Sequence, residues 1–443
     1  MLKIVVMVLL AAAAVLAGED PLPRRPSLGA QVLPVTDAER ADSKVKFEGG
    51  VRLGNVFPGT SAEGAGLTAN DILLSIDGQS LHSASEIGPL LKQIGSNKFV
   101  PVDIIRNERR ETIQMLLRPA PRETSDEFEV MYDAVTVDGF KRRVVITKPR
   151  SAGKFPLVVL IGGLGCYSVD PLQGGMLPYR EILYAMTREG FCTLRIEFTG
   201  MGDSEGPPCA EQGFHDEVHG FVEGIKAISR FDFIDTDNVI LFGQSMGGLV
   251  GPEVATQVPI KGIVALATGA IDWTEYELVN QRRQLVLEGV DYDSIETACK
   301  IKTQALYQLA WAGKSSKDLI KEHPEWEGFL TYPVSDKFVR DLVLMSPATA
   351  LKEMDAKILF IYGTSDFVTC AEEHVYGTEI VNRYHPGHAT YQEIDDFDHF
   401  LIRTPDQKSS FANLQAGLPN KEFNSDVIPI IVKWSKETVG ITK

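Results

Sequence analysis

Basic residues are scarce in this chain relative to acidic ones. It has 44 Lys and Arg against 60 Asp and Glu, which gives a formal net charge of −16 over 443 residues. A protein that binds nucleic acid needs a basic face for the phosphate backbone, and the longest basic run here is Lys141–Arg143. Nucleic acid is therefore not an expected partner.

Cysteine is also scarce. The chain has five cysteines, too few for a small protein that depends on disulfides, and no C-x-x-C pattern, so neither a zinc ribbon nor a thioredoxin-type site is indicated. The hydrophobic fraction of 44% and the charged fraction of 23% are ordinary for a folded soluble protein. The length allows two or three domains. No segment after the N-terminus has the pattern of a transmembrane helix.

The N-terminus carries a single apolar run. Lys3 precedes an unbroken apolar stretch, Ile4–Ala17, which is shorter than the roughly 20 residues that span a bilayer. Val15 and Ala17 place small side chains at the −3 and −1 positions of a signal-peptidase site. We predict that residues 1–17 are a cleaved signal peptide and that the protein is secreted or periplasmic. An uncleaved N-terminal anchor is the alternative.

Residues 26–118 have the pattern of a small, mainly β domain. Short apolar strands alternate with turns rich in Gly, Pro and Asp, and Ser83–Ile94 has apolar residues at helical spacing. Val100–Ile105 and Thr112–Leu117 alternate as the two arms of a hairpin.

This region resembles the bacterial form of the PDZ domain. The motifs that carry the resemblance, in the family's order, are Ser27–Ala30, Pro58–Ala62, Ala65–Leu67, Asn70–Leu73 and Ile76–Gly78. The resemblance implies that Ser27, Leu28, Gly29 and Ala30 form a loop that binds the carboxylate of a peptide or protein C-terminus, with the peptide added as a strand to the sheet edge. Asn70 stands where the family usually has Gly. A PDZ-shaped spacer without a ligand is the alternative.

After a linker of proline and charged residues at 119–126, the pattern changes. From residue 127 to 443, apolar strands alternate with helices, which predicts an α/β domain with a mostly parallel sheet. Residues 271–345 interrupt this alternation with several helices, placed where a cap over the sheet edge would lie. The expected fold class is α/β with a helical cap, preceded by a small mainly-β domain.

Gly243–Gly247 spells G-x-S-x-G between a predicted strand and a predicted helix. In that context the pentapeptide predicts a nucleophile elbow, a strained turn that exposes Ser245 and needs tiny flanking residues. The N-terminus of the following helix would favour an oxyanion at this point. A structural glycine turn with a solvated serine is the alternative.

Serine needs a general base, and the base needs an acid that orients it. In a fold of this kind the expected chain order is Ser, acid, His. Asp366 follows one predicted strand and His399 follows the next, so both should lie at the carboxyl edge of the sheet. Three other acids, Asp395, Asp396 and Asp398, are possible substitutes for Asp366.

An oxyanion hole needs two preorganised N–H donors. We expect one from Met246, the residue after the nucleophile, and one from Leu164 in the glycine-rich loop 162–166, with Gly163 as the alternative. The stretches from about residue 125 to 440 resemble the α/β-hydrolase superfamily, closest to serine esterases and aminopeptidase-like hydrolases. Gly200–Gly206 resembles that family's R-G-x-G-x-S-x-G loop, with Thr199 in place of the Arg.

Two further features concern metals and thiols. His215 and His219 are four residues apart on one predicted helix and could hold zinc, but Glu217 is misplaced for an H-E-x-x-H site. Cys166 and Cys209 lie in loops after neighbouring strands, so a disulfide between them is a hypothesis for an oxidising compartment.

The sequence therefore predicts an exported serine hydrolase that cleaves carboxylic esters and requires no metal or organic cofactor. Its expected partners are a small-molecule ester or peptide substrate and a peptide or protein C-terminus at the PDZ domain. A serine peptidase or aminopeptidase is the alternative within the enzymes, and acyl transfer to an acceptor other than water is also open. A binding protein with a non-catalytic hydrolase scaffold is the alternative from another class.

Overall fold

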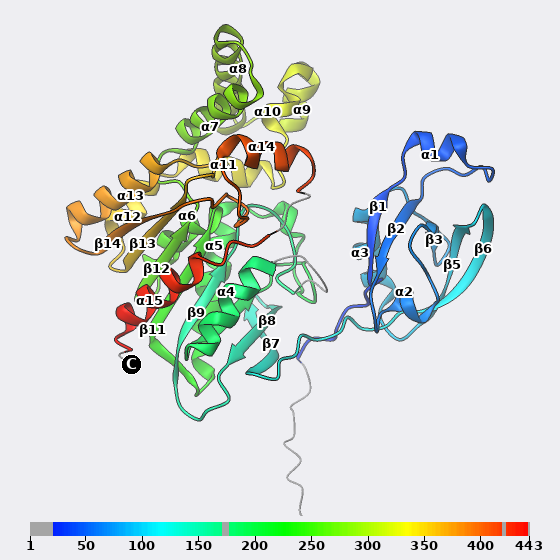
Figure 1. Cartoon of the computed structure of the whole chain (residues 1–443), viewed down its shortest axis with the longest axis horizontal. Coiled ribbons are helices and arrows are strands. Elements are labelled where there is room, and N and C mark those ends of the chain that lie inside the picture. Colours follow the sequence, from blue (N-terminus) through cyan, green and yellow to red (C-terminus); the bar gives the residue numbers. More distant parts are fainter. Residues whose placement is uncertain (1–20, 171–176, 419–421, 442–443) are drawn as a thin grey trace, which may run out of the picture.

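The computed structural model describes residues 21–170, 177–418 and 422–441. The predicted signal peptide at residues 1–17 lies outside this described part. Within it, no helix is both long and apolar enough to cross a membrane. Two modules are visible, a small one near the N-terminus and a large one that contains the rest of the chain (Figure 1).

The small module is built on an antiparallel sheet in the order β1-β2-β3-β5-β6, with the short β4 paired to β3. The strands are β1 (Ala30–Pro34), β2 (Val51–Val56), β3 (Ile72–Ile76), β4 (Gln79–Ser80), β5 (Phe99–Arg106) and β6 (Arg109–Leu116). The helices are α1 (Asp37–Asp42), α2 (Ser61–Gly64) and α3 (Ile87–Ile94). Leu53, Leu73 and Val102 are among the buried residues of a core separate from those of the large module.

Strand β1 lies at one end of this sheet order, so one of its edges has no strand partner among the described residues. It begins at Ala30, which is paired with Val56, and the predicted carboxylate loop therefore ends at Gly29. Helix α3 turns Ile87 and Leu91 toward the core. Strands β1 and β4 were not expected from the sequence, whereas β5 and β6 lie within three residues of the predicted hairpin arms, Val100–Ile105 and Thr112–Leu117.

The large module contains a mixed sheet in the order β14-β13-β12-β11-β9-β10-β8-β7 over the described residues. The run from β14 to β10 is parallel, and β8 and β7 are added antiparallel. The strands are β7 (Glu129–Val137), β8 (Phe140–Lys148), β9 (Phe155–Ile161), β10 (Cys192–Ile196), β11 (Ile234–Gln244), β12 (Gly262–Leu266), β13 (Lys357–Gly363) and β14 (Ala389–Ile394). This is the predicted mostly parallel sheet.

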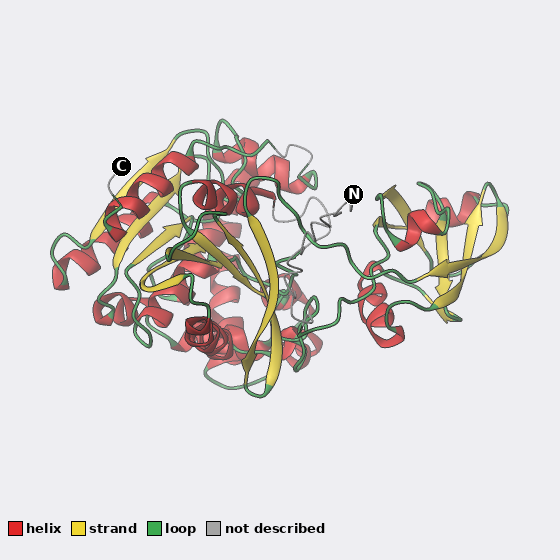
Figure 2. Cartoon of the chain, turned by 90° about the horizontal axis from the view of Figure 1, so that it is seen from below, coloured by secondary structure: helices red, strands yellow, loops and turns green. Residues whose placement is uncertain are grey.

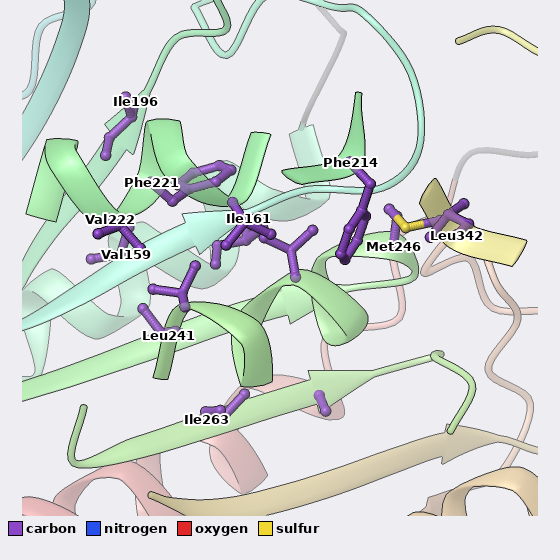
Figure 3. Packing of buried hydrophobic residues seen from close by; sticks show 14 of the residues in the cluster. Val159, Ile161, Ile196, Phe214, Phe221, Val222, Leu241, Met246, Ile263 and Leu342 are labelled. Carbon is purple, nitrogen blue, oxygen red and sulfur yellow. The ribbon is translucent and has the colours of Figure 1, made fainter. Parts of the chain in front are cut away.

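Helices cover both faces of the sheet (Figures 1 and 2). The helices outside the cap are α4 (Leu177–Arg188), α5 (Phe214–Ala227), α6 (Met246–Ala255), α12 (Pro347–Glu353), α13 (Ala371–Tyr384), α14 (Gln407–Gln415) and α15 (Val427–Val439). Alternate residues of β9 face opposite sides: Val158 belongs to the core under α4 and α15, and Val159 to the core under α5 and α6. Figure 3 shows the second core, in which Phe214 and Phe221 of α5 pack near the sheet residues.

The irregular stretch predicted at residues 271–345 is helical. It contains α7 (Trp273–Glu288), α8 (Tyr292–Ala310), α9 (Ser316–Glu322), α10 (Glu327–Leu330) and α11 (Asp336–Leu344). Helices α7 to α10 project from one end of the module (Figure 1). Leu309 of α8 and Leu342 of α11 are buried in the same core as the sheet residues, so the cap is continuous with the module beneath it.

The small module is joined to the large one by two chain segments that run side by side. Pro26 and Pro119 form an antiparallel bridge, and the N–H of Ala120 donates to the carbonyl of Arg25 (2.9 Å). The guanidinium of Arg24 contacts Asp203 of the large module (2.6 Å). The segment before the small module and the linker after it therefore form one two-stranded stalk.

Candidate active site

Ser245 occupies a sharp turn between β11 and α6. Its φ is 53° and its ψ is −118°, a conformation that non-glycine residues rarely adopt. The N–H of Ser245 donates to the carbonyl of Leu266 on β12 (2.9 Å), which fixes the turn to the neighbouring strand. The strained turn predicted for a nucleophile elbow is present.

The glycines that flank the serine are required by close packing. A Cβ at Gly243 would overlap the carbonyl of Gly247, and a Cβ at Gly247 would overlap the carbonyl of Ile161 on β9. A Cβ at Gly248 would overlap the side chain of Thr268. Strand and helix can approach as closely as they do because these positions have no side chain.

His399 lies between Ser245 and Asp366. Its Nε2 is 3.1 Å from Oγ of Ser245, and its Nδ1 is 3.0 Å from Oδ2 of Asp366. Asp366 follows β13 and His399 lies in the loop after β14, so two adjacent parallel strands deliver both groups to the carboxyl edge of the sheet. Asp366 is fully buried and His399 is 8% exposed. A carboxylate can only accept, so Nδ1 carries the proton and Nε2 presents a lone pair to the serine hydroxyl.

The carboxylate of Asp366 is fixed by its own loop. The hydroxyl of Thr369 donates to Oδ2 (2.6 Å), and the N–H groups of Val368 and Thr369 donate to Oδ1 (2.7 and 3.0 Å). Burial by itself raises the pKa of Asp366, but His399 and the bonds from Thr369 bring it below the usual value. The group is therefore ionised at neutral pH, as an orienting acid must be.

The three alternative acids do not contact the imidazole in this way. Asp395 and Asp396 are exposed. Asp398 is buried, but its oxygens accept from the N–H groups of Phe400 and Ile402 (2.9 Å each) and from the hydroxyl of Ser410 (2.9 Å). Asp398 therefore shapes the loop that carries His399.

Residues that the sequence analysis did not single out support the elbow. The side-chain amide of Gln244 donates to the carbonyl of His399 (3.0 Å), and its oxygen accepts from the hydroxyl of Tyr179 (2.5 Å). The hydroxyl of Thr268 donates to the carbonyl of Ser245 (2.9 Å), and its N–H donates to Nε2 of His374 (3.1 Å). Burial lowers the pKa of His374 to about 4, so it is neutral and can accept.

The predicted oxyanion donors lie on the two expected segments. Met246 begins α6, and Gly163 and Leu164 lie in the loop after β9. Both segments line the same cavity as Ser245 and His399. A Cβ on Gly163 would come within 3.5 Å of Cβ of Ser245, which shows how near that backbone is to the elbow.

Cys166 and Cys209 are joined by a disulfide. The bond connects the end of the glycine-rich loop to the segment after Gly206. Both half-cystines line the cavity that contains Ser245. The pairing suggested by the sequence is therefore the one that the structure has.

Arg25 of the N-terminal segment binds the glycine-rich loop that follows Thr199. The guanidinium of Arg25 donates to the carbonyls of Gly200 (3.1 Å) and Ser204, and the N–H of Arg25 donates to Asp203 (2.9 Å). Nε of Arg143 donates to the other oxygen of Asp203 (3.0 Å). The stalk of the small module thus holds the glycine-rich loop 200–206, which lines the same cavity as the serine.

A cavity of about 1780 Å³ extends from the serine to the small module. On the large module its walls include Ser245, His399, Trp273 and Tyr276, the last two from the cap. On the small module they include the carboxylate loop, the first residues of β1 and residues of α3: Ser27, Leu28, Gly29, Ala30, Gln31, Val32, Ile87, Gly88, Leu91 and Lys92. The groove that a PDZ ligand would occupy therefore opens into the same space as the serine.

The histidine pair considered for zinc does not form a metal cluster. His219 of α5 contacts Asp138 (3.0 Å), and neither it nor His215 belongs to a group of three ligand-type side chains in the described parts of the chain. A group of this kind does occur elsewhere, at Asp355, His385 and His388.

Glu197, directly after β10, should make the free energy of unfolding depend on pH. It is 1% exposed and accepts from the hydroxyl of Ser168 (2.6 Å), and burial raises its pKa from 4.5 to about 7. The folded state therefore holds this proton more tightly, and the free energy of unfolding declines as pH rises from 4.5 to 7. We expect Glu197→Gln to be close to wild type near pH 4 and more stable at pH 8, by up to about 3 kcal/mol.

Urea unfolding at both pH values measures this difference, with exposed Glu211→Gln as the control. An equal change of stability with pH in Glu197→Gln and in wild type would contradict the assignment.

The sequence profile described as "Alpha/beta hydrolase family" matches residues 158–407, and the profile described as "PDZ domain" matches residues 54–104. Esterase EstD of Thermotoga maritima is 24% identical over 301 residues, which cover 68% of this chain and 66% of the esterase. The chain thus spans slightly less than two thirds of that relative's length.

Two further similarities concern the separate modules. A probable periplasmic serine endoprotease DegP-like of Hahella chejuensis is 34% identical over 94 residues, 21% of this chain and 19% of that protein. Among solved structures, Est1E from Butyrivibrio proteoclasticus has 14% identity and a TM-score of 0.42, covering 70% of this chain and 99% of that one.

Proposed function

Because the chain belongs to the alpha/beta hydrolase family and carries a PDZ domain, we propose that it is an exported serine hydrolase that cleaves carboxylic esters. The observation that carries the proposal is the position of His399, with one ring nitrogen 3.1 Å from the Ser245 hydroxyl and the other 3.0 Å from the buried Asp366. This is the arrangement that nucleophilic catalysis by serine needs.

In the proposed mechanism, Ser245 Oγ attacks the ester carbonyl while Nε2 of His399 takes the hydroxyl proton. The N–H groups of Met246 and Leu164 stabilise the tetrahedral oxyanion. The imidazolium then gives its proton to the leaving alcohol, and the acyl group remains on Ser245. Water, deprotonated by His399, attacks the acyl-enzyme and releases the carboxylic acid and free Ser245. Asp366 holds the imidazole tautomer throughout.

The ester proposal is tested by comparing short-chain p-nitrophenyl esters with aminoacyl p-nitroanilides of similar size. We expect ester hydrolysis with kcat/KM at least about 100-fold above that of the anilides, together with labelling of Ser245 by a fluorophosphonate probe. Faster anilide hydrolysis would favour the peptidase alternative. Absence of labelling, with neither substrate cleaved, would favour the non-catalytic scaffold.

The PDZ module gives the second candidate function a specific basis. Residues of its groove and Ser245 line one cavity, so a polypeptide held in the groove would enter the space that contains the nucleophile. We propose that the groove binds the C-terminus of a peptide or protein, with Ser27–Ala30 as carboxylate loop and the free edge of β1 as the partner strand. A peptide substrate presented in this way would make the enzyme a peptidase.

Peptide binding is tested by fluorescence polarisation with a labelled peptide that ends in Val. We expect the free acid to bind at least about tenfold more tightly than its C-terminal amide, because only the acid can use the loop. Lys92→Glu, at an exposed position of α3 that lines the cavity, should weaken binding, whereas Lys98→Glu, which does not line it, should not. Equal binding of acid and amide would contradict the carboxylate loop.

The same peptide should raise the KM for a bulky ester more than for an acetate, because both occupy one cavity. An unchanged KM for both esters at saturating peptide would show that the two sites act independently.

We propose export because residues 1–17 have the pattern of a signal peptide, and the disulfide beside the cavity is consistent with an oxidising compartment. N-terminal sequencing of the protein from the culture medium or periplasm should give Gly18 as the first residue. A protein that retains Met1 in the membrane fraction would favour the uncleaved anchor.

A further inference from the structure

A cluster of metal-ligating side chains lies at the opposite edge of the sheet from Ser245. Asp355 lies just before β13, His388 directly precedes β14, and His385 follows α13. One carboxylate oxygen of Asp355 and one ring nitrogen of each histidine lie within 4.8 Å of one another. Because β13 and β14 are parallel neighbours, their amino ends meet at this edge, and their carboxyl ends lead to the site.

The backbone of the turn between α13 and β14 sets the position of both imidazoles. The N–H of His388 donates to the carbonyl of His385 (3.0 Å), and the N–H of Gly387, whose φ is 80°, donates to the side chain of Asn382 (3.0 Å). The carbonyl of His388 accepts from the N–H of Ile358 on β13 (2.8 Å). The two rings lie nearly parallel with their centroids 5.6 Å apart. These bonds fix the backbone from which both imidazoles project.

Each of the two imidazoles keeps one ring nitrogen that could bind a metal ion. Nε2 of His385 is 2.8 Å from the carbonyl of Lys352, which can only accept, so Nε2 carries the proton and Nδ1 of the neutral ring keeps its lone pair. A bond from one ring nitrogen to a carbonyl is the usual support of a metal-bound histidine. Nδ1 of His388 is buried and has no hydrogen-bond partner within the described residues. A buried polar atom without a partner needs an explanation, and a metal ion supplies one.

We infer that Asp355, His385 and His388 form a binding site for a divalent transition-metal ion, with Zn²⁺ as the best match. Two imidazole nitrogens and one carboxylate oxygen suit zinc, whereas Mg²⁺ and Ca²⁺ prefer ligand sets made of oxygen. Three protein ligands leave a fourth tetrahedral position for water. Tetrahedral coordination needs ligand atoms about 3.3 Å apart, so the three ligand atoms, which lie within 4.8 Å of one another, would draw together around the ion.

The position of the ion defines its effect. It would link the segment before β13 to the turn before β14, the two strands whose far ends carry Asp366 and His399. The ion would lie at the amino ends of these strands, whereas Ser245 lies at the carboxyl edge of the sheet. The proposed site therefore stabilises the fold and takes no part in ester cleavage. Metal that binds the folded chain but not the unfolded chain raises stability by mass action.

The test uses the full chain without a histidine tag, treated with a chelator and then titrated with ZnCl₂ by calorimetry. We expect one Zn²⁺ per chain, and a melting temperature a few degrees higher in a large excess of Zn²⁺. The double variant His385→Gln/His388→Gln should weaken binding at least about 100-fold and lose the shift. Mg²⁺ should give neither binding nor a shift.

The matched control is His215→Gln/His219→Gln, which removes a histidine pair of helical spacing elsewhere on the surface and should leave zinc binding unchanged. If the His385/His388 variant does not fold, Asp355→Asn replaces it: this exposed change should keep the metal-free melting temperature and weaken zinc binding about tenfold. Unchanged zinc affinity in the His385/His388 or Asp355 variant, or loss of binding in the control, would overturn the inference. So would an affinity in the wild type no tighter than about 100 µM.

Discussion

Ser245→Ala is expected to lower kcat toward a p-nitrophenyl ester by about 10⁴- to 10⁶-fold, because removal of a triad nucleophile leaves only the oxyanion donors and substrate binding. Stability should change little. The strained backbone conformation at residue 245 costs about the same free energy with alanine as with serine, and the substitution introduces no polar group. The measurement is single-turnover and steady-state hydrolysis by protein whose folded fraction has been checked by circular dichroism.

Ser229→Ala is a suitable control, since Ser229 is exposed and its hydroxyl donates to the carbonyl of Lys226 (2.9 Å). It should retain full activity and full fluorophosphonate labelling, whereas Ser245→Ala should lose both. Residual activity above about a tenth of wild type in a correctly folded Ser245→Ala protein would mean that another group attacks the ester.

The main features of the fold were predictable because they rest on local periodicity. Buried parallel strands such as Leu157–Ile161 form continuous apolar runs, and glycines mark the turns between them. Strand β1 was missed because its residues, Ala30–Pro34, do not alternate clearly and end in proline, so only pairing with β2 makes the segment a strand. Helices α12 and α14 were missed as well, being short and placed between the stronger signals.

The candidate site likewise contains residues that the sequence predicts and residues that it does not. Ser245, Asp366 and His399 were predictable from their positions after β11, β13 and β14, and the structure brings all three together. The supporting groups were not. Gln244 occupies a variable position of its motif, and Arg25 reaches Gly200 across 175 residues of sequence, so neither contact has a local signal. Contacts of this kind depend on the tertiary fold alone.

The histidines before β14 belong to another cluster that the sequence alone does not predict. In the sequence, His385 and His388 are two polar residues in a turn. Asp355 lies about 30 residues earlier, beside a different strand. Only the parallel pairing of β13 and β14 brings the three side chains together at one edge.

Asp366→Asn is expected to lower kcat by about 10³- to 10⁴-fold with little change in KM. The asparagine amide can donate to Nδ1 of His399, where the carboxylate accepts, and this favours the tautomer whose proton is on Nε2. In that tautomer the nitrogen 3.1 Å from Oγ of Ser245 has no lone pair for the serine proton. Binding of the ester is unaffected, because the substituted side chain is fully buried behind the imidazole.

Asp395→Asn provides the matched control, as an exposed carboxylate in the same loop region that should leave kcat unchanged. Asp398→Asn separates orientation from stability. Asp398 accepts from backbone N–H groups and hydroxyls, so its replacement should lower the melting temperature by several degrees while the folded fraction keeps most of its kcat. If instead Asp398→Asn abolished turnover at full stability and Asp366→Asn did not, the acid that orients His399 would be Asp398.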